Sequence, residues 1–234
     1  MKKIEKHQTP ACLGEYIKAQ QSIQPEPVNL TYDCFPEKAA LREILTGEQF
    51  GLCGYTGAPI DDRISNLKSS PSKAIFRNHI EHLKCQETCK RETESNGGKY
   101  GRDLCGDLDY FNMIAAINVI GSQSERFGAA TKDNHDLPVW PIHEDCDTLF
   151  RFEESSGEVS GINAAAEMSI QLLKLDHDTL NGWRKAAIEE WLDPAVIQTH
   201  EDFENVKLAM EQPIKGKLPE YAFVIWLIVK GYLE

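Results

Sequence analysis

The sequence predicts an α+β fold that is mainly helical. Apolar residues recur at helical spacing in residues 36–45 and again from residue 164 onward, whereas the alternation typical of strands is confined to short stretches between them. With 41% hydrophobic residues in 234, the chain has enough apolar material for a sizeable core. We expect an N-terminal helical segment (1–48), a strand-containing module (49–135), and a hairpin followed by a helical region (136–234).

The N-terminal segment is expected to hold two helices. The first covers residues 13–21, after which Pro25 and Pro27 favour an extended connection. The second covers residues 36–45, because a proline stands in its first turn, apolar residues follow at helical spacing, and Gly47 marks its end.

The central module is expected to begin with two strands. Residues 50–53 form a short apolar run that breaks at a glycine-flanked turn. Residues 76–83 (FRNHIEHL) alternate apolar and polar side chains, which is typical of a half-buried strand. Neighbouring residues on a strand point to opposite faces, which is a difficulty for a site shared by Glu81 and His82, and it is resolved if the strand ends at Glu81. We therefore expect His82 to lie in the turn beyond it.

A long polar loop and a helix are expected to complete the module. Residues 85–108 carry three cysteines and a Gly-Gly pair, and loops of this length are uncommon unless they are functional or stabilised. Turn-prone residues then lead into the alanines and aliphatics of residues 112–120. For these we expect a helix that ends at Gly121.

The C-terminal region is expected to be helical after one hairpin. Residues 122–148 have no regular pattern. Residues 148–152 and 158–162 flank a Ser-Ser-Gly turn, which predicts two paired strands. Helical spacing continues from residue 164, and Pro219 introduces the last helix.

Composition favours a cytoplasmic protein. The first residues lack the apolar stretch of an export signal, and seven cysteines without such a signal favour reduced thiols or metal ligands over a disulfide framework. The longest apolar run, residues 221–229, is too short to cross a membrane. We expect this run either to lie in the chain's own core or to dock in part on another protein.

Glu81, His82 and Asn112 form the candidate catalytic set. A histidine titrates near neutral pH and can activate water as a general base. A divalent ion, Mg²⁺ or Mn²⁺, held by a carboxylate and an amide oxygen can stabilise charge on a phosphate. The three side chains together predict phosphodiester hydrolysis, with His82 as base, Glu81 as metal ligand, and Asn112 in both the catalytic and the metal set.

Three motifs in this order resemble a known family. Residues 53–57 (CGYTG), 80–82 (IEH) and 110–116 (YFNMIAA) resemble the HNH endonuclease subunits of Septu-type anti-phage systems (PtuB-like), including those encoded beside retrons. The likeness spans roughly residues 36–192, because it continues through the expected hairpin and three further segments, 137–141 (LPVWP), 145–147 (DCD) and 175–184 (LDHDTLNGWR).

The resemblance implies a ββα-metal (HNH) nuclease module with a mainly helical remainder. It implies that the chain is the effector of an anti-phage complex and that no membrane is a partner. It implies a nucleic-acid substrate and an ABC-type or SMC-like ATPase partner (PtuA-like). In retron-associated systems it also implies a reverse transcriptase and its msDNA. By position it gives His82 the general-base role, Glu81 a metal role, and Asn112 the orienting or metal-contacting role. Additional candidates for the site are His79, Asn118 and His135.

The cysteines depart from the family pattern. Related HNH proteins often carry a zinc ribbon of two Cys-x-x-Cys pairs around this module. The four corresponding positions here are Cys53, Thr56, Ile117 and Gly128, so only the first of them keeps a cysteine. The candidates for a replacement structural zinc site are Cys85, Cys89 and Cys105, because zinc tolerates the Cys-x3-Cys spacing of the first two. The alternative is that these three are small buried residues.

Charge is unevenly distributed along the chain. The net charge is −12, yet residues 68–102 hold eight basic and four acidic residues, a balance of +4. The candidate nucleic-acid contacts in this segment are Arg77, Lys84, Lys90 and Arg91; the alternative is an ordinary solvated surface. An acidic chain repels a polyanion, so we expect a partner to supply much of the affinity.

Two alternatives to a DNA endonuclease remain open at this point. A catalytically degenerate HNH fold could serve as a nucleic-acid-binding or scaffolding subunit, which the lost cysteines and the acidic charge favour. The target could also be RNA, such as tRNA, because attack by activated water needs no 2′-hydroxyl.

Overall fold

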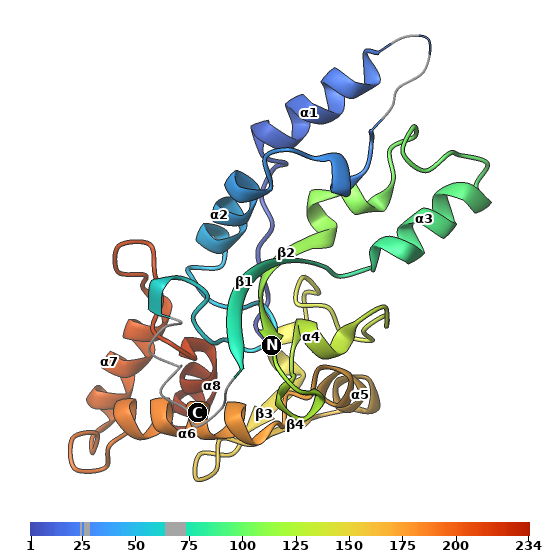
Figure 1. Cartoon of the computed structure of the whole chain (residues 1–234). Helices are drawn as coiled ribbons and strands as arrows, with labels where there is room; N and C mark the ends of the chain where they lie inside the picture. The colour runs from blue at the N-terminus through green and yellow to red at the C-terminus, as the bar shows by residue number, and fades with distance from the viewer. Residues whose placement is uncertain (24, 26–28, 64–73) are drawn as a thin grey trace.

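A pair of antiparallel strands forms the centre of the molecule (Figure 1). The computed structural model describes residues 1–23, 25, 29–63 and 74–234. Strands β1 (Ile75–His82) and β2 (Met113–Ile120) pair along their whole length, from Ile75 opposite Ile120 to His82 opposite Met113. Helices α1 (Ala11–Gln21) and α3 (Gln86–Ser95) project from one end of the molecule, and the C-terminal helices lie at the other (Figure 1).

Strand β2 corrects the expected helix over residues 112–120. The segment is apolar on both faces, and every residue except Asn118 and Ile120 is buried. A fully buried apolar run has no periodicity that separates helix from strand, so the alanines were a misleading signal. The helix of the module comes later and is short: α4 (Ala129–Lys132) packs against β2.

Three further expectations for the module were wrong. Strand β1 continues through His82 rather than ending at Glu81. Residues 50–53 form a turn in which only Leu52 makes a bridge, to Pro59. The loop over residues 85–108 contains α3, whose first turn is capped by the Cys85 thiol accepting from the Thr88 N–H. This helix is polar almost throughout, so no apolar stripe marked it in the sequence.

The remaining helices and the hairpin confirm the predictions, and the fold is α+β with more helix than strand. Helix α2 (Lys38–Glu48) lies in the N-terminal segment, and β3 (Phe150–Phe152) pairs with β4 (Val159–Gly161). The C-terminal helices are α5 (Ala164–Leu173), α6 (Asp178–Trp191), α7 (His200–Glu211) and α8 (Ala222–Leu233). Short 3₁₀ helices are η1 (Tyr32–Cys34), η3 (Gly106–Leu108), η4 (Tyr110–Asn112), η5 (Gln123–Glu125) and η6 (Cys146–Thr148).

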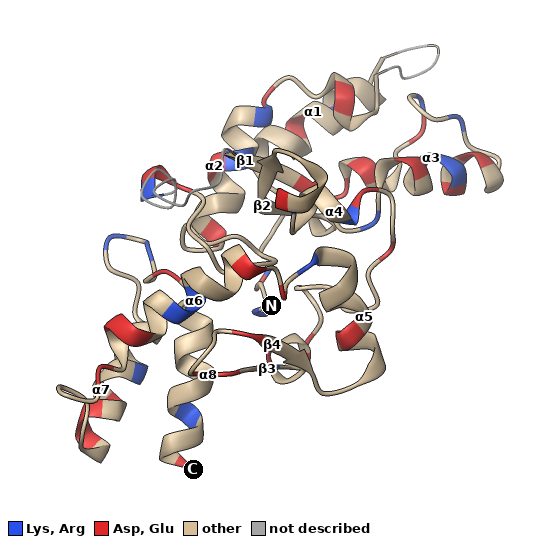
Figure 2. Ribbon diagram, turned by 60° about the horizontal axis from the view of Figure 1, so that its bottom comes forward, with Lys and Arg blue, Asp and Glu red and all other residues tan. Residues whose placement is uncertain are grey.

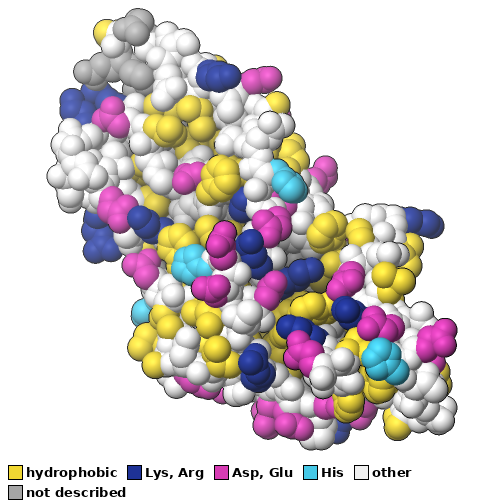
Figure 3. Space-filling model, turned by 180° about the vertical axis from the view of Figure 1, so that it is seen from behind, with side chains coloured by type: hydrophobic (Ala, Val, Ile, Leu, Met, Phe, Trp, Pro, Cys, Tyr) yellow, Lys and Arg dark blue, Asp and Glu magenta, His cyan; other side chains and the backbone are white. Residues whose placement is uncertain are grey.

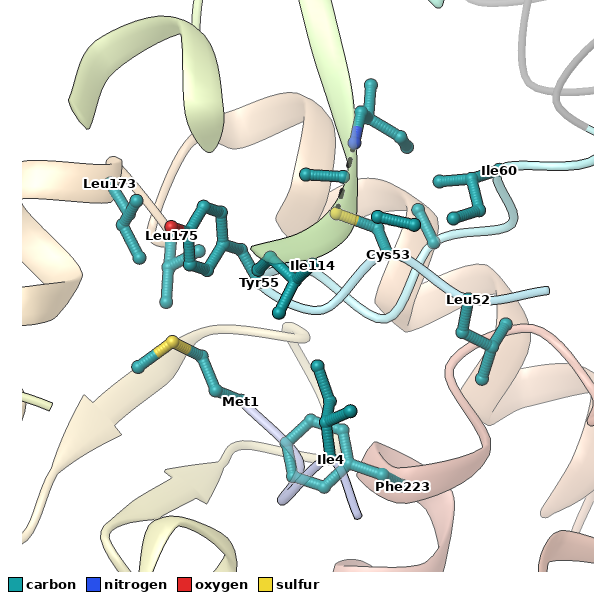
Figure 4. Packing of buried hydrophobic residues seen from close by; sticks show 14 of the residues in the cluster. Met1, Ile4, Leu52, Cys53, Tyr55, Ile60, Ile114, Leu173, Leu175 and Phe223 are labelled. Atoms are coloured by element: carbon teal, nitrogen blue, oxygen red, sulfur yellow. Dashed lines mark hydrogen bonds between the residues drawn. The ribbon is translucent and has the colours of Figure 1, made fainter. Parts of the chain in front are cut away.

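The apolar run at residues 221–229 contributes to the chain's own core. Six of its nine residues are buried, and the other three, Trp226 to Ile228, are partly buried and pack against the core. Figure 4 shows Phe223 of α8 meeting Ile4 of the N-terminal segment, below Ile114 of β2 and Tyr55 of the turn. In the described part of the chain, no helix has the length and apolarity needed to span a membrane.

Candidate active site

His82 is the best-defined candidate base. The side chain lies at the end of β1 and is 7% exposed. Its Nε2 is 3.0 Å from the backbone carbonyl oxygen of Asp107. A carbonyl oxygen can only accept, so Nε2 carries the proton in the neutral ring, and Nδ1 keeps the lone pair. Burial is the main cause that lowers the pKa of His82 below 6.5. The ring is therefore neutral at pH 7, with Nδ1 able to take a proton.

The ring of Tyr32 stands beside this base. Tyr32 belongs to η1, and its ring meets the His82 ring edge-on with 4.6 Å between centroids. The N-terminal segment therefore packs against the His82 ring.

Glu81 and His79 lie on the other face of β1. Strand geometry places residues two apart on the same face, and His79 Nε2 is 3.2 Å from Glu81 Oε2. The His79 side chain is 44% exposed, so this pair opens to solvent. Tyr55, in the turn, is influenced by the same carboxylate. Burial, and after it the Glu81 charge, raises the pKa of Tyr55. Glu81 and His82 thus point apart, although the Glu81 charge still raises the pKa of His82 in part.

Lys132 was not anticipated from the sequence and is central to this cluster. Its ammonium group is 3.2 Å from Glu81 Oε1 and donates to the His82 carbonyl oxygen at 2.9 Å. The residue is 1% exposed, and buried lysines are rare unless they are paired. Fifty residues separate Lys132 from His82, so only the packing of α4 against β2 reveals the contact. Lys132 compensates the Glu81 charge and ties α4 to the end of β1.

Asn112 holds the long insertion between the two strands closed. Its Oδ1 accepts from the Lys84 N–H at 2.7 Å, and its Nδ2 donates to the carbonyl oxygens of Lys84 and Gly106. The amide therefore hydrogen-bonds backbone groups near both ends of the insertion. This geometry favours a positioning role for Asn112 over the metal-ligand role expected from the sequence.

Two donors remain for a divalent ion. Glu81 Oε2 and His79 Nε2 converge at the solvent-facing side of the cluster, while Lys132 occupies the other carboxylate oxygen. Among the described residues, no three His, Cys, Asp or Glu side chains form a metal-binding group. One carboxylate and one imidazole fit a weakly held divalent ion whose remaining ligands are water and phosphate. The metal role of Glu81 stays a prediction, and His79 rather than Asn112 is placed to share it.

The structure separates the other candidate residues. Asn118 faces Arg77 five pairs away from His82, about 17 Å along the strands, so neither belongs to the site. His135 Nδ1 contacts the Lys132 carbonyl oxygen, just after α4. Lys84 pairs with Glu92, and Lys90 and Arg91 lie on α3, which carries acidic and basic side chains (Figure 2). Lys68 and Lys73 of the basic segment lie outside the described residues.

Each cysteine of the candidate zinc site already has a protein partner. The Cys85 thiol caps α3, the Cys89 thiol lies between the Lys84 carbonyl and the Asn112 amide, and the Cys105 thiol donates to the Asp107 carboxylate. Burial raises the pKa of Cys89 to about 11 and that of Cys105 to about 12, so both are protonated at neutral pH. Zinc at these residues stays a prediction, and the thiols as they stand serve as small buried hydrogen-bonding groups.

Positions 53, 56, 117 and 128, which correspond to the cysteines of the zinc ribbon, lie together in the fold, but only the first of them is a cysteine. The Cys53 Sγ accepts from the Ile117 N–H at 3.3 Å, drawn as the dashed line in Figure 4. A Cβ at Gly128 would lie 3.6 Å from the Thr56 methyl group and 3.9 Å from the Ile117 carbonyl oxygen. One thiol among a threonine, an isoleucine and a glycine cannot hold zinc. Packing and a weak hydrogen bond close the turn in its place.

Comparison of the chain with protein-family models and with curated proteins finds no match.

Proposed function

We propose that the chain is a metal-dependent HNH-type endonuclease that hydrolyses phosphodiester bonds in DNA, or in RNA such as tRNA. The observation that carries this proposal is the state of His82: a neutral ring whose Nε2–H is held by the Asp107 carbonyl, leaving Nδ1 as an oriented base. The supporting arrangement is a strand pair followed by a short helix, with Glu81 on the opposite face of β1 and Lys132 joining its carboxylate to the His82 backbone carbonyl.

The proposed reaction follows from these positions. His82 Nδ1 takes a proton from water as the water oxygen attacks phosphorus, and the bond to the 3′-oxygen breaks. The products are a 5′-phosphate and a 3′-hydroxyl, whose proton comes from solvent. Glu81 and His79 would hold a divalent ion that, when bound, neutralises charge on the phosphate. Lys132 keeps the Glu81 carboxylate and the His82 backbone in place.

The proposal includes a partner. The chain carries a net −12, and on the face seen in Figure 3 basic and acidic side chains are interspersed rather than gathered into one basic surface. Such a surface attracts a polyanion weakly. An ATPase partner in an anti-phage complex, as the family resemblance implies, would supply the missing affinity for nucleic acid.

The cleavage rate is expected to depend on pH through His82. The base must be neutral, so the rate should rise with pH and reach half its plateau below pH 6.5, because burial lowers this pKa. Stability follows the same sign: the contribution of neutral His82 is present above pH 6.5 and is lost as pH falls through the lowered pKa. Single-turnover cleavage and denaturant unfolding between about pH 5 and 8 check both. A half-maximal rate above pH 6.5 would contradict the assignment.

Cleavage is expected to vanish in EDTA and to return with added Mg²⁺ or Mn²⁺. Two protein donors give modest affinity, so the ion should be replaceable and substrate-assisted. The measurement is the product profile of DNA and RNA after incubation with the purified chain, alone and with a co-purified ATPase partner. Glu81→Gln should shift the metal dependence to higher concentration. Full activity in the chelator would point to another class of nuclease.

A second candidate function is a catalytically degenerate HNH-fold subunit that binds nucleic acid or serves as a scaffold. The observation that favours it is the engagement of the Asn112 amide with backbone groups, which leaves only two converging metal donors. The same incubation separates the two functions, because a degenerate subunit binds DNA or RNA without producing new ends under any ion condition.

A further inference from the structure

Asp107 is a fully buried acid that the sequence did not mark. Its side chain is 0% exposed. Three donors, one from the N-terminal segment and two from the loop before η3, meet its carboxylate: the Tyr32 N–H at 3.3 Å, the Tyr100 hydroxyl at 2.8 Å, and the Cys105 thiol. Burial of a carboxylate is costly, and this number of donors offsets the cost. These three hydrogen bonds fix the position of Asp107.

The same residue holds the proposed base by its backbone. The Asp107 carbonyl oxygen accepts from His82 Nε2. Asp107 lies in η3, a 3₁₀ helix of three residues within the insertion between β1 and β2. So short a helix has little rigidity of its own. The direction of its carbonyl group therefore depends on the anchors of this turn, which are the Asp107 carboxylate and the Asn112 amide bound to the Gly106 carbonyl oxygen.

We propose that Asp107 is the positioning residue of the nuclease site: its buried carboxylate fixes the carbonyl group that selects the Nε2–H tautomer of His82. The inference rests on the proposed function of His82 as base. It adds that the correct ring nitrogen is made available by a side chain that touches neither substrate nor ion.

The carboxylate also connects the base to the N-terminal segment. Tyr32 donates its backbone N–H to Asp107 and places its ring against His82. The Tyr32 ring and the Asp107 carbonyl, which both contact the His82 ring, therefore share the same anchor. Burial and the Asp107 hydrogen bond raise the pKa of Cys105 to about 12, and the pKa of Tyr100 is raised as well, so the thiol and the phenol act as donors at neutral pH.

The decisive variant is Asp107→Asn, which keeps the shape but replaces one acceptor oxygen by an NH₂ group. The Asn side chain cannot accept all three hydrogen bonds, so the 3₁₀ turn should shift and release His82 Nε2. In ¹⁵N-histidine NMR spectra, His82 of the unmodified chain should show one Nε2–H tautomer. In Asp107→Asn it should show a mixture of both tautomers, and the cleavage rate should fall at least tenfold with unchanged KM.

Two further variants complete the test. Asp103→Asn is the matched control, because this acid lies on the same loop but is exposed, and it should leave the His82 tautomer unchanged. Tyr100→Phe removes one donor while keeping the buried carboxylate, and it should shift the tautomer ratio in the same direction if Asp107→Asn fails to fold. A His82 signal that stays purely Nε2–H in both Asp107→Asn and Tyr100→Phe would overturn the proposal.

The tautomer readout separates this inference from the proposed function. If the unmodified chain cleaves neither DNA nor RNA, the nuclease proposal fails. The NMR result still shows whether Asp107 positions His82. If the chain cleaves and the tautomer is insensitive to both variants, the nuclease proposal stands and the positioning role of Asp107 falls.

Discussion

Replacing His82 with alanine is expected to lower the cleavage rate by at least ~10², the usual scale of a lost general base. The physical reason is that Nδ1 of this ring is left as an oriented acceptor when Nε2 donates to the Asp107 carbonyl oxygen. The change removes the proton acceptor without touching the Glu81–Lys132 pair, which contacts only the His82 backbone carbonyl. Single-turnover cleavage of labelled nucleic acid gives the rate, and cell toxicity gives a second readout.

The matched control for His82 is another histidine outside the site. His143 is exposed, stacks on Trp140 and accepts the Trp140 N–H, so His143→Ala should leave cleavage unchanged and lower stability only slightly. Because His82 is buried, the variant needs a folding check by circular dichroism and thermal unfolding. A folded His82→Ala protein with the unmodified cleavage rate would remove the proposed mechanism.

Replacing Lys132 with methionine is expected to lower the free energy of unfolding by about 3–5 kcal/mol, the usual cost of breaking a buried ion pair from one side. Glu81 would keep its charge in a buried setting without its cation, and the His82 carbonyl would lose its donor. Denaturant unfolding measures the change directly. Activity should fall with it, since the strand end that carries His82 loses its tie to α4.

A double variant and a surface control test this cause. Glu81→Gln combined with Lys132→Met removes both charges and should recover most of the lost stability. Lys185→Met breaks the exposed pair with Glu189 on α6 and should cost no more than about 0.5 kcal/mol. Equal losses in the single and double variants would show that lost packing, and not the uncompensated carboxylate, is responsible.

Local signals in the sequence were sufficient for the amphipathic helices and the hairpin. Helix α2 has its proline, its apolar stripe and its terminal glycine within a dozen residues, and the β3–β4 hairpin has its turn between two short apolar runs. Strand β2 was misread because a segment buried on both faces shows no alternation. Its identity is set by pairing with β1 across an insertion of thirty residues, which no local pattern records.

The site was predictable in part for the same reason. His82 and Asn112 stood out as residue types in order along the chain, and the structure places both at the ends of the insertion. Lys132 and Asp107 did not stand out, because a lysine or an aspartate in a polar segment is ordinary until its burial is known. Their partners lie far away in sequence or belong to the backbone, so only the folded chain reveals them.

The turn around Cys53 shows how this module differs from a zinc-dependent one. Its closure relies on the contact of Cys53 with Ile117 and the fit of Thr56 against Gly128. Thiolate-ligated zinc couples a fold to the supply of free metal and to the redox state of its sulfurs. Because these four positions cannot hold zinc, metal starvation leaves the closure of this turn intact. Under the proposed function, a chelator therefore acts on the ion at Glu81 and His79, while the turn around Cys53 stays closed.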